Sequence, residues 1–263
     1  MPARPVPKRS ALAAPQVQNF RSLLAKALKE TDSEGRVWAA AQWGCYAFYD
    51  YDGEPIYVGQ TNEQLRTRVR RHLTGQRSDA VAMRILDVFE VAGMELWPLW
   101  ELEGLSKTDK SARRRLDALE YSAYLQSIEQ SKFNAILNEK IPPHSERTEL
   151  PPSRRFQLIS DETRAERGHP DIRIARRAET LSRLSAVAHE RGEVSPGLRR
   201  VIVVQAARLA HLAASRFAYA EGRDAPSTDA INIEGLVGTL LQEHNTLQLP
   251  TDDDPEASAS DLD

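Results

Sequence analysis

Aromatic and β-branched residues alternate with small or polar ones in two short runs near residue 50. The run CYAFYDY, at residues 45–51, leads into the turn sequence YDGE and then into PIYVGQT, at residues 55–61. Such runs on either side of an Asp-Gly turn are typical of a β-hairpin. The sequence MELWPLWEL, at residues 94–102, predicts a third strand, in which Pro98 favours an edge position or a bulge.

Apolar residues recur at intervals of three and four in several longer segments, which predicts amphipathic helices. Several of these segments begin with Ser, Asp or Pro, the usual signals of a helix N-terminus. From the N-terminus onward, the predicted helices are residues 16–30, 65–73, 78–93, 109–131, 172–193, 195–222 and 227–244.

Together these elements predict an α/β (α+β) fold. Helices flank a small three-stranded antiparallel sheet, and an all-helical C-terminal domain follows. Residues 143–171 are rich in proline and charge, so we interpret them as a linker or an extended arm outside the core. The expected parts are a disordered N-terminus plus one helix at 1–36, the α/β domain at 37–142, the linker at 143–171, a helical domain at 172–249 and a disordered acidic tail at 250–263.

The charge is distributed unevenly along the chain. The net charge is −3, but the last segment, TDDDPEASASDLD, carries six acidic side chains and no basic one. Without those six charges, residues 1–250 have a net charge of +3. An acidic tail on a mildly basic body leaves room for local basic patches that attract nucleic acid.

The composition disfavours several classes of protein. The single cysteine, Cys45, allows neither an intrachain disulfide nor a zinc cluster of thiolates. The N-terminus has no hydrophobic stretch of a secretory signal, and no apolar run approaches the roughly 20 residues of a membrane span. With 41% hydrophobic and 28% charged residues, we expect a cytoplasmic protein with a packed core and no membrane partner.

Residues with side chains suited to catalysis lie on the predicted hairpin and on the helices after it. The tripeptide GCY ends at Tyr46 on the first strand, and YVG begins eleven residues later at Tyr57 on the second. After the hairpin come, in order, Leu65, Arg68, His72, Leu119, Glu120, Phe133 and Asn134. In this order, over residues 42–138, the motifs resemble those of the GIY-YIG nuclease family.

The resemblance implies a metal-dependent DNA endonuclease that hydrolyses phosphodiester bonds. It implies one Mg²⁺ (or Mn²⁺) ion per active site, with Glu120 as the only protein ligand. Arg68 can offer a fork of donors to phosphate oxygens, and preorganised charge is usually the largest catalytic contribution. By the same resemblance Asn134 completes the catalytic set, although Asn138 competes for its role.

Proton transfer in such a site falls to tyrosine and histidine side chains. A tyrosine ordinarily has a pKa near 10, so it is a weak base at neutral pH unless a nearby cation lowers that value. His72 lies four residues after Arg68, hence on the same helix face, and its ordinary pKa suits proton transfer near pH 7. We expect Tyr46 to be the base, His72 to orient it or relay its proton, and Tyr57 to position water or phosphate.

Further residues are expected to contact the substrate. Gly59 lets backbone approach the substrate closely. Gln60 stands where the family often has lysine, which removes one phosphate contact, and Cys45 stands where it usually has isoleucine or valine. The clusters at residues 66–71, 113–115 and 154–155 either form solvated surfaces or contact DNA phosphates. The expected substrate-binding residues are Gly59, Gln60, Arg66, Arg70 and Arg71.

Several biological roles are open at this point. A restriction or phage-defence enzyme, a repair enzyme and a mobile-element enzyme all fit such a nuclease. The helical segment shows neither zinc ligands nor a helix-hairpin-helix glycine pattern, which favours restriction or phage defence, and cutting both strands favours a homodimer. The alternatives without catalysis are a DNA-binding protein on an inactive nuclease scaffold and an adaptor that binds a protein partner through its C-terminal helices. The intact catalytic set argues against the inactive scaffold.

Overall fold

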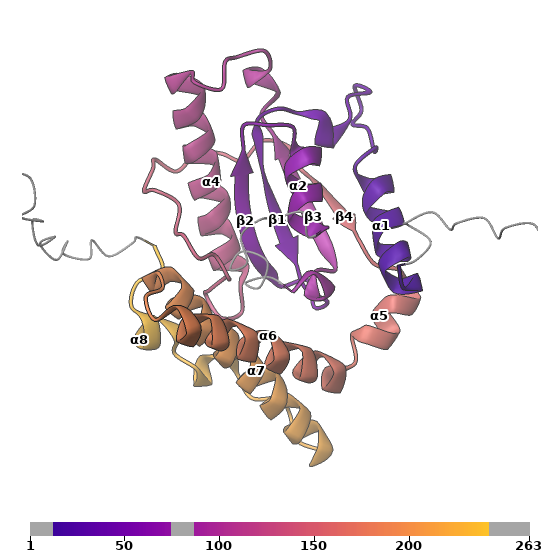
Figure 1. Ribbon diagram of the computed structural model, residues 1–263, viewed down its shortest axis with the longest axis vertical. Coiled ribbons are helices and arrows are strands. Elements are labelled where there is room, and N and C mark those ends of the chain that lie inside the picture. Colours follow the sequence, from indigo (N-terminus) through magenta and orange to yellow (C-terminus); the bar gives the residue numbers. More distant parts are fainter. Residues whose placement is uncertain (1–12, 75–86, 242–263) are drawn as a thin grey trace, which may run out of the picture.

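A computed structural model describes residues 13–74 and 87–241 of the chain. Its centre is a four-stranded antiparallel sheet with the strand order β2-β1-β3-β4 (Figure 1). The predicted hairpin and third strand are confirmed, and β2 forms one edge of the sheet. The strands are β1 Gly44–Tyr49, β2 Pro55–Thr61, β3 Gly93–Pro98 and β4 Arg154–Gln157.

The fourth strand corrects two expectations, a sheet of three strands and a stretch at residues 143–171 outside the core. β4 pairs with β3, with Phe156 opposite Met94. The side chain of Phe156 is 5% exposed and that of Leu158 is fully buried. The sequence does not predict this strand, because it is a short edge strand with charged residues and only one of its side chains is buried. The proposed boundary between two domains stays a prediction.

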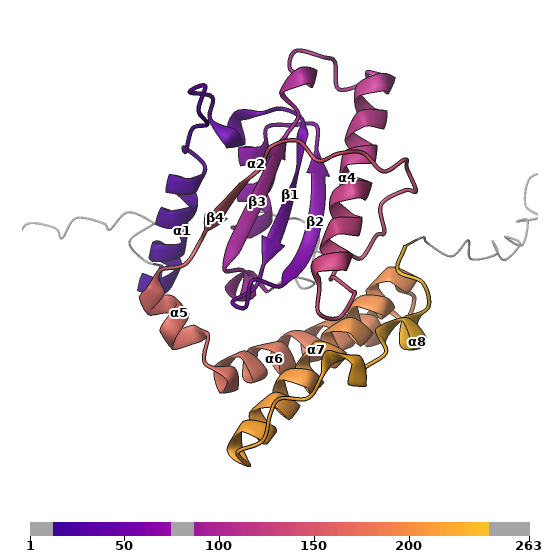
Figure 2. The same cartoon turned by 180° about the vertical axis from the view of Figure 1, so that it is seen from behind.

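Helices cover both faces of the sheet (Figures 1 and 2). One face carries Tyr46 and Phe48, and the other carries Cys45 and Ala47, because successive residues of a strand point to opposite sides. The first face packs against α2 and the second against α4. The predicted helices near the sheet are confirmed as α1 Pro15–Ala27, beside β4, α2 Leu65–Leu73 and α4 Lys110–Gln130.

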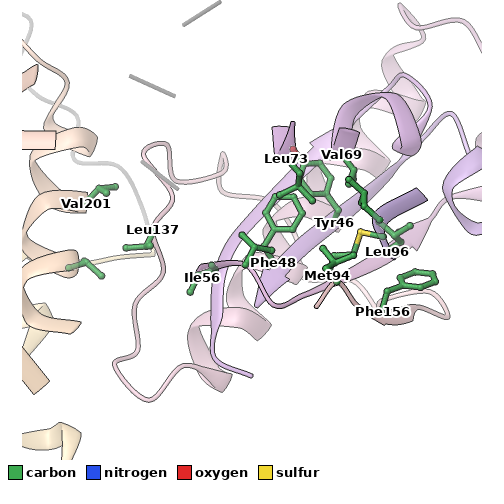
Figure 3. Packing of buried hydrophobic residues seen from close by; sticks show 14 of the residues in the cluster. Tyr46, Phe48, Ile56, Val69, Leu73, Met94, Leu96, Leu137, Phe156 and Val201 are labelled. Atoms are coloured by element: carbon green, nitrogen blue, oxygen red, sulfur yellow. The ribbon is translucent and has the colours of Figure 1, made fainter. Parts of the chain in front are cut away.

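The apolar core on the α2 face continues beyond the sheet. Figure 3 shows Tyr46 and Phe48 close to Leu73 and Val69, and it shows Val201, of α7, across from the loop that follows α4. All of these side chains belong to one buried cluster. The C-terminal helices therefore share part of their core with the sheet.

Two long helices, α6 Pro170–Arg191 and α7 Pro196–Ala220, pack side by side across one end of the sheet (Figure 1). The last predicted helix, 227–244, is shorter than expected, because Gly238 at φ 76° ends α8 and residues after 241 lie outside the described residues. The remaining elements are α5 Asp161–Arg167, α8 Ile233–Val237 and the 3₁₀ turns η2 Trp38–Ala40, η3 Val88–Glu90, η4 Trp100–Leu102 and η5 Thr228–Ala230.

Three further predictions fall wholly or partly outside the described residues. Most of the helix predicted at 78–93 lies there, and the rest of that segment is the 3₁₀ turn η3 with its flanks and the start of β3. The predicted disorder at the N-terminus falls mainly on residues 1–12, and the acidic tail at 250–263 lies wholly outside.

Helix α7 is long and apolar enough to cross a membrane by length and composition alone, contrary to the expectation drawn from the sequence. Its Arg208 is nevertheless 2% exposed and ion-pairs with Asp50. Val201 and Val204 of the same helix belong to the core shared with the sheet. Packing within the chain thus accounts for these apolar positions.

A buried ion cluster joins the hairpin turn to α6 and α7. Arg173, Arg177 and Arg208 donate to the same oxygen of Asp50, at 3.1, 3.0 and 3.0 Å. Arg177 also donates to Glu90 at 3.1 Å. These five residues, the Asp50 cluster, hold the turn between β1 and β2 against the long helices, and so they fix the strands that carry both tyrosines.

Candidate active site

Strand pairing brings the two predicted tyrosines to the α2 face of the sheet. In the β1–β2 register, Tyr46 lies opposite Gly59 and Phe48 lies opposite Tyr57. The ring centroids of Tyr46 and Tyr57 are 6.2 Å apart. Tyr46 is fully buried whereas Tyr57 is partly exposed, so of these two tyrosines only Tyr57 reaches the surface.

Gly59 makes room for the ring of Tyr46. A Cβ at position 59 would lie 2.8 Å from the Tyr46 hydroxyl oxygen and 2.9 Å from its Cζ. Distances this short are far inside van der Waals contact. Position 59 therefore needs a glycine because the Tyr46 side chain lies across β2 at this point. That Gly59 also lets the backbone approach the substrate closely stays a prediction.

His72, on α2, contacts both tyrosines. Its Nδ1 lies 3.1 Å from the Tyr46 hydroxyl, and its ring meets the Tyr57 ring edge-on with centroids 4.7 Å apart. When Nδ1 is unprotonated, the hydroxyl donates to it, and a proton can pass from oxygen to nitrogen. His72 is 6% exposed, so this pair is shielded from solvent. The contact has the geometry that the predicted relay requires.

Arg68 lies one helical turn before His72 and beside Tyr46. Burial lowers the pKa of Arg68, but the hydrogen bond and charge of Tyr46, and the charges of Tyr57 and Glu63, raise it, and the net shift is upward. The guanidinium therefore stays positive and favours negative charge on the neighbouring phenol oxygen. Its Nε is buried without a hydrogen-bond partner among the described residues, so one donor of the fork is unused.

Glu120 approaches the same edge of the sheet from α4, three residues after Asp117. Burial and the negative charge of Asp117 raise the pKa of Glu120 to about 7, against the opposing effects of hydrogen bonds from Gln60 and the charge of Arg68. Gln60 Nε2 also donates to Asp117 Oδ1 at 2.9 Å. We call Asp117 and Glu120 the acidic pair, and Gln60 is the β2 residue that binds it.

A hollow of about 320 Å³ opens between β2, α2 and α4. It presents guanidinium donors and carboxylate acceptors together, the combination suited to a phosphate group with a bound cation. Its lining residues are Gln60, Thr61, Asn62, Glu63, Arg68, Arg113, Leu116 and Asp117.

The acidic pair fits a hard divalent cation. Mg²⁺ prefers carboxylate and carbonyl oxygens, and it keeps several waters. Oε1 of Gln60 is buried and has no hydrogen-bond partner in the described part of the chain. Within residues 13–74 and 87–241 no three side chains of His, Cys, Asp or Glu come together as a metal site. An ion held here therefore has few protein ligands, which leaves positions for water and phosphate.

The structure does not bring Asn134 to this group. Asn134 is exposed, with φ 48°, and it lines a separate hollow of about 390 Å³ between the end of α4 and α8. The side chain of Asn138 instead accepts from the N–H of Val58 at 3.0 Å and donates to its C=O at 2.8 Å. Asn138 therefore holds β2 between Tyr57 and Gly59, and it is the asparagine that supports the site.

The other arginines on α2 differ in their surroundings. Arg70 is exposed, and Arg71 ion-pairs with Glu63, which already neutralises it. Arg66 is half-buried, and its Nε has no hydrogen-bond partner among the described residues. Arg113, of α4, lines the hollow with Arg68. Arg70 and Arg113 are therefore the arginines best placed to meet a phosphate backbone near the site.

The remaining arginine clusters are partly held by contacts within the fold. Arg115 donates to Thr148, whereas Arg114 is exposed. In β4, Arg154 ion-pairs with Glu30, and the Arg155 guanidinium lies over the Tyr49 ring at 3.5 Å from its centroid. Arg154 and Arg155 are thus bound within the fold and do not form a free arm that could reach into DNA.

Sequence reasoning missed Asp117. The signal was present, because residues three apart on a helix lie on the same face, and this spacing puts Asp117 beside Glu120. The hydrogen bond from Gln60 to Asp117 could not be predicted from the sequence, because it depends on how β2 lies against α4. From the sequence, Gln60 was interpreted as the loss of one phosphate contact and also as a substrate-binding residue, and the second interpretation stays a prediction.

Residues 42–122 match the family model of the GIY-YIG catalytic domain. This range contains every predicted catalytic residue except Asn134, namely Tyr46, Tyr57, Arg68, His72 and Glu120. No curated protein and no solved structure gave a match. The similarity to a GIY-YIG catalytic domain thus covers residues 42–122, and the rest of the described chain is mainly helical.

Proposed function

We propose that the chain is a metal-dependent endonuclease that hydrolyses phosphodiester bonds of DNA. The observation that carries the proposal is the convergence of Arg68, the Tyr46–His72 hydrogen bond and Glu120 at the β2 edge of the sheet. Positive charge, a proton acceptor and a cation ligand are the groups that this hydrolysis needs. The match to a nuclease family supports the same reaction class.

The tyrosines and His72 handle the proton of the attacking water. Tyr46 accepts that proton while its own phenolic proton passes to Nδ1 of His72, 3.1 Å away. Arg68 stabilises the negative charge that builds on the phenol oxygen during this transfer. Because Tyr46 is fully buried, the water must reach it past the partly exposed Tyr57, which positions the water.

The hollow binds the scissile phosphate. Arg68 and Arg113 line it and donate to phosphate oxygens, where they offset the charge of the transition state. Glu120 would hold Mg²⁺ (or Mn²⁺), one ion per active site. When bound, such an ion neutralises phosphate charge and stabilises the leaving oxygen.

For the biological role we propose restriction or phage defence in the cytoplasm, with a homodimer as the cutting unit. One active site cuts one strand, so cleavage of a duplex favours two copies of the chain. An inactive DNA-binding scaffold is the competing function. The retention of Tyr46, Arg68, His72 and Glu120 in mutual contact or charge interaction supports the enzyme over the scaffold.

The test is cleavage of supercoiled plasmid in Mg²⁺ by the wild type and by Glu120→Ala. Glu129→Ala is the matched control, because Glu129 lies on the same helix but is exposed and pairs with Arg147 at 2.8 Å. We expect the wild type and the control to cleave, and we expect chelator or Glu120→Ala to abolish cleavage. Cleavage that persists in either case contradicts the proposal, and DNA binding without any cleavage favours the inactive scaffold. Linear product supports the dimer, whereas nicked circles contradict it.

A further inference from the structure

Asp117 is a carboxylate of the site to which the family resemblance gives no role. It lies three residues before Glu120, so both carboxylates leave α4 on one face. It lines the hollow together with Arg68 and Arg113. Its negative charge acts on Glu120, whose pKa it helps to raise. The second carboxylate is therefore inside the site and not on a neighbouring surface.

Gln60 links the two carboxylates. Its Nε2 donates to Asp117 Oδ1 at 2.9 Å, and its side chain also hydrogen-bonds Glu120. With the amide nitrogen turned toward α4, Oε1 is buried and lacks a hydrogen-bond partner among the described residues. A neutral amide orients two carboxylates without cancelling their charge. The amide thus holds the two carboxylates through its nitrogen.

Nearby cations do not neutralise the acidic pair. In the described part of the chain neither Asp117 nor Glu120 forms a salt bridge, although many other acids do so. Arg68 is engaged with Tyr46, and Arg113 donates through its Nε to the backbone carbonyl of Lys107 at 2.8 Å. Two carboxylates that are held together and left unpaired carry an electrostatic cost that a divalent cation removes.

We propose that Asp117 is a second carboxylate of the cation site, held beside Glu120 by Gln60, and that it sets the affinity of the site for a divalent ion. The proposal rests on the proposed function, because it concerns the same site. A site with two carboxylates attracts a divalent cation more strongly than a site with one, since affinity rises with the charge of the ligands. Asp117 acts either as a direct ligand or through bound water, and the affinity falls on its removal in both cases.

The test is Mn²⁺ binding to the full chain without DNA, followed by the loss of the paramagnetic resonance signal of free Mn²⁺. We expect Asp117→Asn to weaken Mn²⁺ binding by about 10–100-fold. Glu129→Gln removes the same charge from an exposed position of the same helix, and we expect it to bind like the wild type. Equal affinity in the wild type and Asp117→Asn overturns the inference.

Two further comparisons keep the outcome unambiguous. Asp117→Glu keeps the charge, so binding within a few-fold of the wild type supports an electrostatic role, whereas a loss as large as that of Asp117→Asn contradicts it. Circular dichroism confirms that each variant is folded before binding is measured. A wild type that cleaves DNA and binds Mn²⁺ no better than Asp117→Asn overturns only this inference. A wild type that neither binds Mn²⁺ nor cleaves DNA overturns the proposed function as well.

Discussion

Two groups of charged side chains are buried or half-buried in this chain, and they are built in opposite ways. In the Asp50 cluster, Arg173, Arg177 and Arg208 donate to one carboxylate oxygen at 3.0 to 3.1 Å. In the acidic pair, two carboxylates share one neutral amide, and the pKa of Glu120 is raised to about 7 by burial and by its acidic neighbour. Opposite charges are thus in contact in the first group, and like charges are adjacent in the second.

The difference separates a structural use of buried charge from a functional one. The Asp50 cluster joins the hairpin turn to the two long helices, and the charge of Asp50 is neutralised by arginines of the same chain. The acidic pair keeps negative charge that nothing in the described residues neutralises through a salt bridge, which suits a partner from outside. Burial of charge alone therefore does not distinguish the proposed site from the Asp50 cluster, whereas the balance of sign within each group does.

The largest expected effect is on catalysis, for Arg68→Ala. Removing the guanidinium takes away both a phosphate donor and the charge beside Tyr46, so we expect the single-turnover cleavage rate to fall by about 10³-fold. Arg70→Ala is the comparison, because it removes an exposed positive charge of the same helix that we expect to meet the DNA backbone and not the reacting phosphate, so its loss in rate should be much smaller. Equal losses in the two variants would show that Arg68 acts only through the general charge of α2.

Next in size is the effect of Asp50→Asn on stability. The substitution removes the carboxylate that three buried guanidiniums share and leaves them only their other acidic neighbours, so we expect the free energy of unfolding to fall by about 3–5 kcal/mol in urea denaturation. Asp171→Asn is the matched control, because Asp171 pairs with Arg216 at 2.9 Å on the surface and should matter much less. A loss for Asp50→Asn no larger than that of the control would refute the structural role of the Asp50 cluster.

A smaller effect is expected for Gly59→Ala, which connects stability to the site. The added Cβ meets the Tyr46 hydroxyl at 2.8 Å, so the fully buried ring must shift, which disturbs its hydrogen bond with His72. We expect a loss of about 1–3 kcal/mol in unfolding free energy together with a lower cleavage rate. Adding Tyr46→Phe to this variant removes the hydroxyl and should restore part of the stability but none of the activity. Full activity in Gly59→Ala is the contrary result.

The smallest expected effect is the pH dependence of Glu120→Gln, measured with chelator present. The folded-state pKa of Glu120, about 7, lies above the ordinary value of 4.5, so the folded wild type binds more protons than the unfolded chain between these values. Wild-type stability therefore declines as pH rises through this window, whereas Glu120→Gln lacks this decline. At pH 8 we expect the variant to be more stable than the wild type by about 1–2 kcal/mol, with little difference below pH 4.5. Glu129→Gln should show no such change across the window, and a flat difference for Glu120→Gln would contradict the raised pKa.

Much of the fold was readable from the sequence, because its signals are local. The hairpin follows from alternation around Asp52-Gly53, and α2 and α4 follow from their apolar spacing. β4 was not readable, since a four-residue edge strand is defined by its pairing with β3, about sixty residues earlier in the chain. The Asp50 cluster is also non-local, because Asp50 and Arg208 are 158 residues apart.

The sequence predicts the main candidate residues of the site, which stay predictions, but it did not indicate the residues that support them. The motif order identifies Tyr46, Arg68 and Glu120, because each stands at a fixed place in the family pattern. The asparagine was assigned to Asn134, but the backbone turns there with φ 48° and leaves that side chain exposed. Asparagine is one of the few residues besides glycine that adopt a positive φ, so the turn at Asn134 agrees with its sequence. The support of β2 by Asn138 depends on a contact between residues 80 apart, and it became visible only in three dimensions.

The role of the acidic pair is best decided by the single-turnover cleavage rate of Glu120→Gln in Mg²⁺, at a pH where the variant is at least as stable as the wild type. We expect a folded, stable protein that has lost cleavage, because the charge of Glu120 serves the cation and costs stability. A Glu120→Gln variant that cleaves DNA at the wild-type rate would show that the acidic pair is not part of the catalytic site.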